Sequence, residues 1–216
     1  MDYAHIRDLM VETQVRTNDV TDVRILAAMR SLPRERFLPA GKRALAYADI
    51  EPEVASGRTL LRPRDLSKLL QALAPQPHER ALEIAGATGY GAALLAACCR
   101  HAIAHDPDPD LSFAARAALE SVGATNVKTV STPAAEAWAE EAPYDVIMLN
   151  GATEIVPEAW LAQLAPGGRL GAIVRDGAAG AARIYTRSGD AVAFRVAFDA
   201  APPLAPGLSR PPAFAF

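Results

Sequence analysis

Apolar residues in the first third of the chain recur every three or four positions, the spacing of an amphipathic helix. In the first predicted helix, residues 3–16, this face consists of Tyr3, Ile6, Leu9, Met10 and Thr13. A second helix is expected to carry on one side Val23, Leu26, Met29 and Leu32. Asn18, Asp19 and Thr21 offer caps before it, and Pro33 ends it. Pro63 suits the first turn of a third helix, whose apolar face is Leu66, Leu69, Leu70 and Leu73.

From residue 80 the pattern changes to short apolar strands that alternate with helices. Strands are predicted over residues 80–85, 101–105, 126–130, 144–149 and 169–175, and helices over 90–100 and from about Asp110 to Gly123. The Pro166-Gly167-Gly168 run is expected to be a tight turn before the fifth strand. Two further strands, 182–187 and 191–198, are joined by Ser188-Gly189-Asp190, a hairpin signal.

Repeated strand–helix units of this kind predict an α/β fold: a Rossmann-like, doubly wound, seven-stranded and mostly parallel sheet. The last two strands form its terminal antiparallel hairpin. We expect one domain over 1–216, divided into a helical lead-in and substrate-side segment (1–78), the sheet (79–200) and an extended tail (201–216).

Composition narrows the class of protein without indicating its activity. Of 216 residues, 50% are apolar and 22% charged, with a net charge of −3, which excludes disorder and shows no basic excess for nucleic acid. Cys98 and Cys99 are neighbours and cannot form a disulfide framework. The longest apolar run, 92–99, is too short to cross a membrane, and Asp2 stands where a signal peptide needs base. We therefore expect a soluble, cytoplasmic protein.

The turn after the first strand of the sheet is a candidate nucleoside site. It reads Glu83-Ile84-Ala85-Gly86-Ala87-Thr88-Gly89, and Asp106 ends the next strand 23 residues after Glu83. In open α/β sheets a carboxylate at about this distance accepts hydrogen bonds from both ribose hydroxyls. An adenosine-containing cofactor is one interpretation; the other is a glycine-rich turn and an exposed aspartate before Pro107.

Two features favour S-adenosylmethionine over a nicotinamide cofactor. The turn lacks the Gly-x-Gly-x-x-Gly spacing that makes room for a pyrophosphate. The chain also closes with a strand hairpin and has no second nucleotide-binding half.

At these residues the chain resembles the protein-L-isoaspartate O-methyltransferases, class I methyltransferases that use S-adenosylmethionine. The matching segments are 10–16 (MVETQVR), 33–39 (PRERFLP), 46–49 (AYAD), 57–59 (GRT), 82–84 (LEI), 89–90 (GY), 144–145 (YD), 156–157 (VP) and 164–170 (LAPGGRL). The Pro-Arg-Glu-Arg-Phe-x-Pro run is the most specific of them, whereas Pro-Gly-Gly is general to class I methyltransferases.

The resemblance implies methylation of a carboxylate on a damaged protein or peptide, an activity in protein repair. It implies that Asp106 meets the adenosyl ribose, that residues 85–89 line the methionine portion and that Asn150 faces cofactor or substrate. The cofactor-binding candidates are Glu83, Ala85, Gly86, Ala87, Gly89, Asp106 and Asn150. The substrate-side candidates are Thr59, Leu61 and Arg62.

The chain departs from the family pattern within this site. The family turn reads Glu-Ile-Gly-x-Gly-x-Gly-Tyr, but its first two glycines are here Ala85 and Ala87. An alanine at positive φ costs on the order of 1 kcal/mol, so we expect weak binding or a turn reshaped around Gly86. The family's substrate-loop serine is Leu61, and Pro133 stands where an aspartate usually lies near the adenine.

A carboxylate substrate is ionised at neutral pH and needs no general base, so the missing base does not argue against methylation. Arg58, Arg62 and Arg64 could hold an anionic group or be solvated loop residues. His105 beside Asp106 is interpreted as incidental, not as a catalytic pair. The departures also leave open a non-catalytic relative that uses the fold as a binding module, or a methyltransferase for another substrate.

Overall fold

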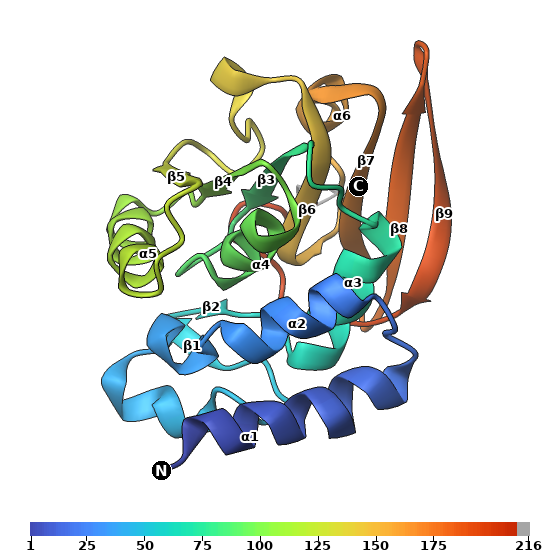
Figure 1. The fold of residues 1–216 in the computed structure, drawn as a ribbon. Helices are drawn as coiled ribbons and strands as arrows, with labels where there is room; N and C mark the ends of the chain where they lie inside the picture. Colours follow the sequence, from blue (N-terminus) through green and yellow to red (C-terminus); the bar gives the residue numbers. More distant parts are fainter. Residues whose placement is uncertain (211–216) are drawn as a thin grey trace.

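The computed structural model describes residues 1–210, and its centre is a seven-stranded sheet (Figure 1). The strands are β3 (Arg80–Ile84), β4 (His101–His105), β5 (Val127–Val130), β6 (Tyr144–Thr153), β7 (Leu164–Asp176), β8 (Ala179–Ser188) and β9 (Ala191–Asp199). Their order is β5-β4-β3-β6-β7-β8-β9; the first five are parallel, and β8 and β9 pair antiparallel. The predicted fold class, including the terminal hairpin, is confirmed.

The two faces of the sheet are covered differently because alternate side chains point to opposite sides. One face packs in a cluster with α3 (Pro63–Leu73), α4 (Tyr90–Cys98) and α5 (Pro109–Ser121). The other packs against the short α6 (Glu158–Ala162), the loop after β5 and the C-terminal tail. The four leucines predicted for the buried face of α3 are all buried.

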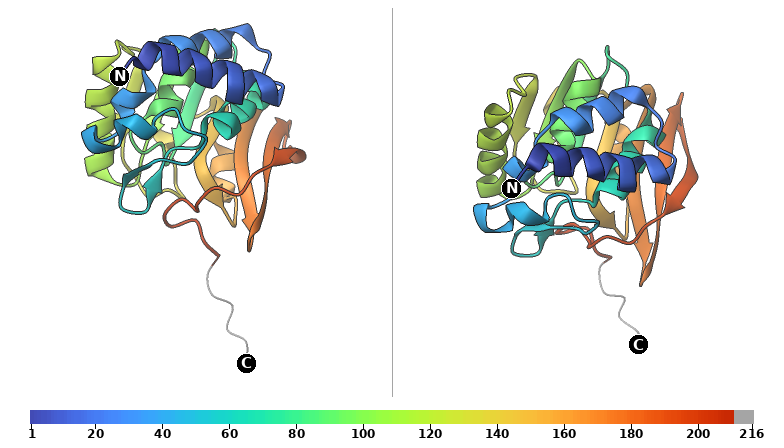
Figure 2. Two further views of the ribbon diagram at one scale, coloured as in Figure 1. Left: turned by 90° about the horizontal axis from the view of Figure 1, so that it is seen from below. Right: turned by 60° about the horizontal axis from the view of Figure 1, so that its bottom comes forward.

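The N-terminal helices form a further layer over the first of these faces (Figure 2). Helix α1 (Tyr3–Met10) continues through a π-helical segment (Val11–Val15) and a 3-10 turn (Arg16–Asn18), so the helical structure predicted for residues 3–16 is confirmed. Two residues of its predicted apolar face are nevertheless exposed, Leu9 and Thr13. Helix α2 (Val23–Ser31) is capped by the Asp22 carboxylate and not by the three candidates named above. Of the four residues expected on one side of α2, Leu26 and Met29 are buried, whereas Val23 lies in the first turn and is 75% exposed.

Several elements between the predicted ones have no periodic signal. A two-stranded hairpin, β1 (Glu53–Ala55) and β2 (Arg58–Thr59), follows 3-10 turns at Arg34–Phe37 and Ala40–Leu45. The Pro166-Gly167-Gly168 run is not a turn before β7 but an irregular part of it, because Tyr144 pairs with Leu164 while Val146 pairs with Arg169. A further 3-10 turn is Ala139–Glu141.

The tail beyond β9 lies along the end of β6. The Ala152 N–H donates to Pro203 O at 3.0 Å, and the Ala205 N–H donates to Ala152 O at 2.8 Å. Leu208 is buried beside them. The predicted tail thus contacts β6 within residues 201–210; residues 211–216 of that prediction lie outside the described part. Within residues 1–210 no helix has the length and apolarity to cross a membrane.

Candidate functional site

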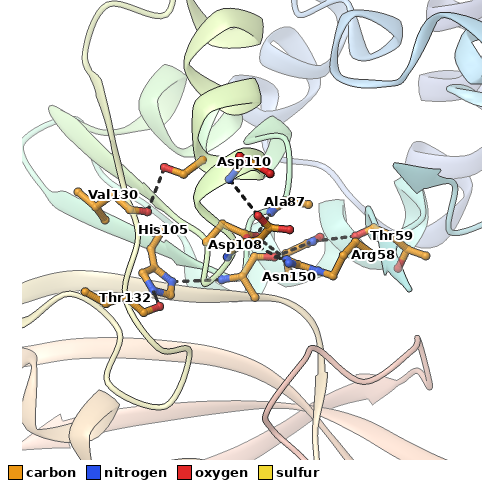
Figure 3. A network of polar contacts seen from close by, with 12 residues as sticks. Arg58, Thr59, Ala87, His105, Asp108, Asp110, Val130, Thr132 and Asn150 are labelled. Carbon is orange, nitrogen blue, oxygen red and sulfur yellow. Dashed lines mark hydrogen bonds and ion pairs between the residues drawn. The ribbon is translucent and has the colours of Figure 1, made fainter. Parts of the chain in front are cut away.

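The predicted site residues converge where the strand order reverses. Strand β3 lies between β4 and β6; the turn 85–89 follows β3, Asp106 follows β4, and Asn150 lies within β6, three residues before its last. Figure 3 shows Ala87 of the turn and Asn150. Ligands of open α/β sheets bind at this reversal. The topology therefore brings together residues that are dispersed over the sequence.

The turn keeps two left-handed alanines. Ala85 has φ 54° and Ala87 φ 53°, and Gly89 (φ 84°) caps α4. The turn was expected to place Gly86 in the left-handed region in place of the alanines. It does not, since Ala85 and Ala87 have positive φ and Gly86 has not. Gly86 is required for space instead: a Cβ there would lie 2.4 Å from Glu83 Oε2. Each alanine costs on the order of 1 kcal/mol in this conformation, and neighbouring bonds hold it in place.

Asp106 is not an exposed loop aspartate; it is 1% exposed. Its Oδ1 accepts from Arg58 Nη1 at 2.8 Å and from the Asp108 N–H at 2.9 Å. Its Oδ2 accepts from the Ala87 N–H at 2.7 Å and from Arg58 Nη2. Arg58 is itself buried, so the interpretation of Arg58 as a solvated loop residue is wrong. It holds an anionic group, and that group belongs to this chain.

Asn150 joins the substrate-side segment to the turn. Its Nδ2 donates to Thr59 O at 2.9 Å and to Ala85 O at 3.2 Å, and its Oδ1 accepts from the Leu61 N–H at 3.0 Å. The amide therefore spans from β2 to the end of β3.

Glu83 lies beneath the first turn of α4. Its Oε2 accepts from the Ala92 N–H at 2.8 Å, whereas Oε1 has no hydrogen-bond partner within residues 1–210. Burial raises the pKa of Glu83 to about 8, with the nearby Asp106 charge adding to the rise and the Ala92 bond opposing it. The carboxyl is thus mainly protonated at neutral pH.

His105 has a structural role, consistent with its interpretation as incidental. Its Nε2 lies 2.8 Å from Thr132 O, and its Nδ1 lies 3.5 Å from the Ala85 nitrogen. Burial lowers the pKa of His105, so the ring is neutral and serves the turn's backbone. Burial also raises the pKa of the Cys98 and Cys99 thiols, as expected of core residues.

The three substrate-side candidates are placed differently from one another. Thr59 contributes its backbone oxygen to Asn150. Leu61 is buried, so its side chain packs where the family has a serine. Arg62 turns away to Glu51, with Nη2 at 3.0 Å from Oε2. Pro133 is exposed in the loop after β5.

The sequence did not indicate Arg34, whose side chain binds the backbone of the substrate-side segment at Leu61. The side chain is fully buried; its Nε donates to Ala46 O and its Nη2 to Leu61 O, both at 2.8 Å. The guanidinium carbon lies 4.7 Å from the centre of the Tyr90 ring. Arg34 belongs to the Pro-Arg-Glu-Arg-Phe-x-Pro run. The specificity of this motif for the family was the only feature of the sequence that could have indicated a role for Arg34.

In this arrangement the residues do not fit the ribose of S-adenosylmethionine. A carboxylate offers about four acceptor positions, and four donors of this chain take those of Asp106. The carboxylate is of the right kind and in the right place, but two ribose hydroxyls find no acceptor position free.

The sheet order, the turn after β3 and the carboxylate after β4 define a Rossmann-like α/β protein with a candidate nucleoside site. A sequence model of the protein-L-isoaspartate(D-aspartate) O-methyltransferase family matches residues 6–197, and the chain belongs to this family. It is thus a member of a methyltransferase family whose cofactor is S-adenosylmethionine, as the resemblance implied.

Curated relatives carry the family name. A protein-L-isoaspartate O-methyltransferase of Methanoculleus marisnigri is 36% identical over 76% of this chain and 74% of its own. One of Methylorubrum populi is 39% identical over 76% of this chain and 77% of its own.

Solved structures agree on the fold. A protein-L-isoaspartate O-methyltransferase superposes with a TM-score of 0.82 at 23% identity, covering 94% of this chain and 67% of that one. A Plasmodium falciparum structure described as a complex with S-adenosyl-L-homocysteine has a TM-score of 0.78 at 15% identity, covering 92% and 97%.

Proposed function

We propose that this protein transfers a methyl group from S-adenosylmethionine to a carboxylate of a protein or peptide, with isoaspartyl residues of damaged chains as the first substrates to test. Family membership supports the reaction class. The single observation that carries it is the turn at the end of β3, where Ala85 and Ala87 hold left-handed backbone beside Asp106. We further propose that residues 1–216 act as one unit in the cytoplasm.

The proposed roles follow from where the side chains lie. Asp106 would accept from the ribose hydroxyls once a donor of this chain has left its oxygens, residues 85–89 would line the methionine portion, and Asn150 would orient the segment that carries Thr59. S-adenosylmethionine supplies, when bound, a methyl group on a positively charged sulfur. The substrate carboxylate is already ionised, so the chain's contribution is orientation and exclusion of water.

Leu61 stands at the position of the family's substrate-loop serine, and this difference affects the isoaspartyl substrate. Its side chain can neither donate nor accept a hydrogen bond, and its backbone N–H and oxygen are used by Asn150 and Arg34. We therefore expect slower transfer to isoaspartyl peptides than a chain with the family serine would show.

The binding prediction is a shift in melting temperature with ligand. S-adenosylhomocysteine at 100 times its dissociation constant is expected to stabilise the fold by about 2.7 kcal/mol, because it binds only the folded state. Differential scanning fluorimetry measures the shift, with NAD at equal concentration as the control. Labelled S-adenosylmethionine and an isoaspartyl peptide then report methyl transfer.

The Arg58–Asp106 pair favours one second candidate, a relative that uses the fold for binding without catalysis. A melting shift without methyl transfer to the isoaspartyl peptide would indicate another substrate. No shift at millimolar S-adenosylhomocysteine would contradict cofactor use and favour the binding module.

A further inference from the structure

Arg58 reaches the cofactor site from a small and weakly anchored element. It is the first residue of β2, directly after the exposed Ser56-Gly57 turn of the β1–β2 hairpin. Gly57 has φ 66°, and nothing lies within 4 Å of its Cβ position. Hairpins of two short strands are at best marginally stable by themselves. The Gly57 N–H bonds within the hairpin, to Glu53 Oε1 at 3.3 Å, so a rearrangement of the Ser56-Gly57 tip breaks no hydrogen bond to the seven-stranded sheet.

The Arg58 side chain nevertheless runs inward and is almost fully buried. Its two terminal nitrogens meet the two oxygens of Asp106, and Nη2 also donates to Ala85 O at 3.2 Å (Figure 3). A planar guanidinium matches a carboxylate with two parallel, charge-assisted bonds. Two-bond, charge-assisted pairs of this kind are among the strong hydrogen bonds of proteins.

A ribose would use the same positions. Its two hydroxyls are donors, and the backbone N–H groups of Ala87 and Asp108 occupy the other acceptor positions of Asp106. These amides are backbone groups of the β3 turn and of the residue that caps α5, so their withdrawal would require the backbone of both elements to move. Arg58 is the donor that can withdraw.

We propose that Arg58 is a built-in competitor of the cofactor, which sets the cofactor's affinity by holding Asp106 until the guanidinium withdraws. The inference rests on the proposed function. Asn150 keeps the backbone of Thr59 and Leu61 in place, so the movement is confined to Arg58 and the Ser56-Gly57 tip. The apparent dissociation constant is then the intrinsic value divided by the fraction of molecules in which Arg58 is withdrawn.

Arg58→Gln is the variant that tests this competition. Glutamine is neutral and cannot make the two parallel bonds, whereas the Ala87 and Asp108 amides still orient Asp106. S-adenosylhomocysteine, titrated calorimetrically, is expected to bind Arg58→Gln at least about tenfold more tightly than the unaltered protein, because the closed state is removed. Arg58→Lys keeps the charge but loses the planar fork, so its affinity for S-adenosylhomocysteine is expected to lie between those of the unaltered protein and Arg58→Gln. If Arg58→Gln does not fold, Arg58→Lys still tests the competition.

Arg169→Gln is the matched control. Arg169 also makes a two-bond pair with a carboxylate, to Glu79, with Nη2 at 2.9 Å from Oε2. Glu79 precedes β3, so this pair lies at the opposite end of the strands from the site. Arg169→Gln and Arg58→Gln are both expected to lower the melting temperature without ligand, but only Arg58→Gln is expected to tighten binding.

Three outcomes would overturn the proposal, and they separate it from cofactor use. Equal affinity in the unaltered protein and both Arg58 variants would reject the competition and leave cofactor use standing. A tenfold gain in Ala85→Gly/Ala87→Gly with no gain in Arg58→Gln would assign the obstacle to the alanine methyl groups. Absence of binding in every variant at millimolar ligand would reject both the competition and the proposed function.

Discussion

Arg34→Ala is expected to destabilise the fold by about 3–5 kcal/mol. The substitution leaves the Ala46 and Leu61 carbonyls without their donor in a buried region. It also opens a cavity against the Tyr90 ring, over which the guanidinium lies. Burial lowers the pKa of Arg34, so removing the charge recovers part of its desolvation cost. The recovery is smaller than the loss because two orphaned carbonyls and a cavity remain.

Urea denaturation measures this effect against a total stability of about 5–15 kcal/mol for a typical domain. Arg36→Ala is the matched control, since Arg36 lies in the same 3-10 turn and is exposed; we expect a change within about 0.5 kcal/mol. Arg34→Met keeps most of the volume, so its loss should be smaller and isolates the hydrogen bonds. Equal stability of Arg34→Ala and Arg36→Ala would contradict a supporting role for Arg34.

Glu83→Gln is expected to flatten the fall in stability between pH 5 and pH 8. The pKa of Glu83 rises from 4.5 to about 8 on folding because the carboxyl is buried. The folded state keeps this proton where the unfolded state releases it, so the contribution is complete below pH 4.5 and is lost as pH rises through about 8. At about 1.4 kcal/mol for each pKa unit, the effect amounts to several kcal/mol.

Free energies of unfolding at pH 5, 6.5 and 8 test this sign. As pH rises, the free energy of unfolding of Glu83→Gln should increase relative to that of the unaltered protein. Titration of His105 contributes equally to both proteins and therefore cancels from the difference. Glu79→Gln is the contrasting variant: burial opposes its charge, but bonds from Arg169 and the Gln76 N–H outweigh burial and lower the pKa of Glu79. Glu79→Gln should therefore lose more stability relative to the unaltered protein as pH rises from acidic values through 4.5, because the ionised Glu79 stabilises the fold. Parallel pH profiles of Glu83→Gln and the unaltered protein would refute a buried, protonated Glu83.

The sheet was predictable because each parallel strand is a short apolar run between clear turn signals. The β1–β2 hairpin was not, since strands of three and two residues have no periodicity to detect. Val23 shows the limit of helical periodicity: its spacing fits the buried face, but it lies in the first turn, where α2 has no neighbour to cover it.

The sequence predicted which residues come together at the candidate site, but not the contacts that they make there. The topology rule located the turn and Asp106, and the family pattern drew attention to Ala85 and Ala87. Gly86 was expected to reshape the backbone of the turn. In the structure it is needed because a side chain at this position would collide with the Glu83 carboxyl. That close approach depends on how the turn folds back over β3, which spacing along the chain does not encode.

Local patterns therefore determined the parallel sheet and the family, and they predicted which turn and carboxylate form the candidate site, because strands, caps and motifs depend on neighbouring residues. The tertiary structure decided what occupies that site. Arg58 and Asp106 are 48 positions apart, and Arg34 and Leu61 are 27 apart. Such pairs exist only after folding, when burial removes water from charged groups and forces each of them to find a partner within the chain.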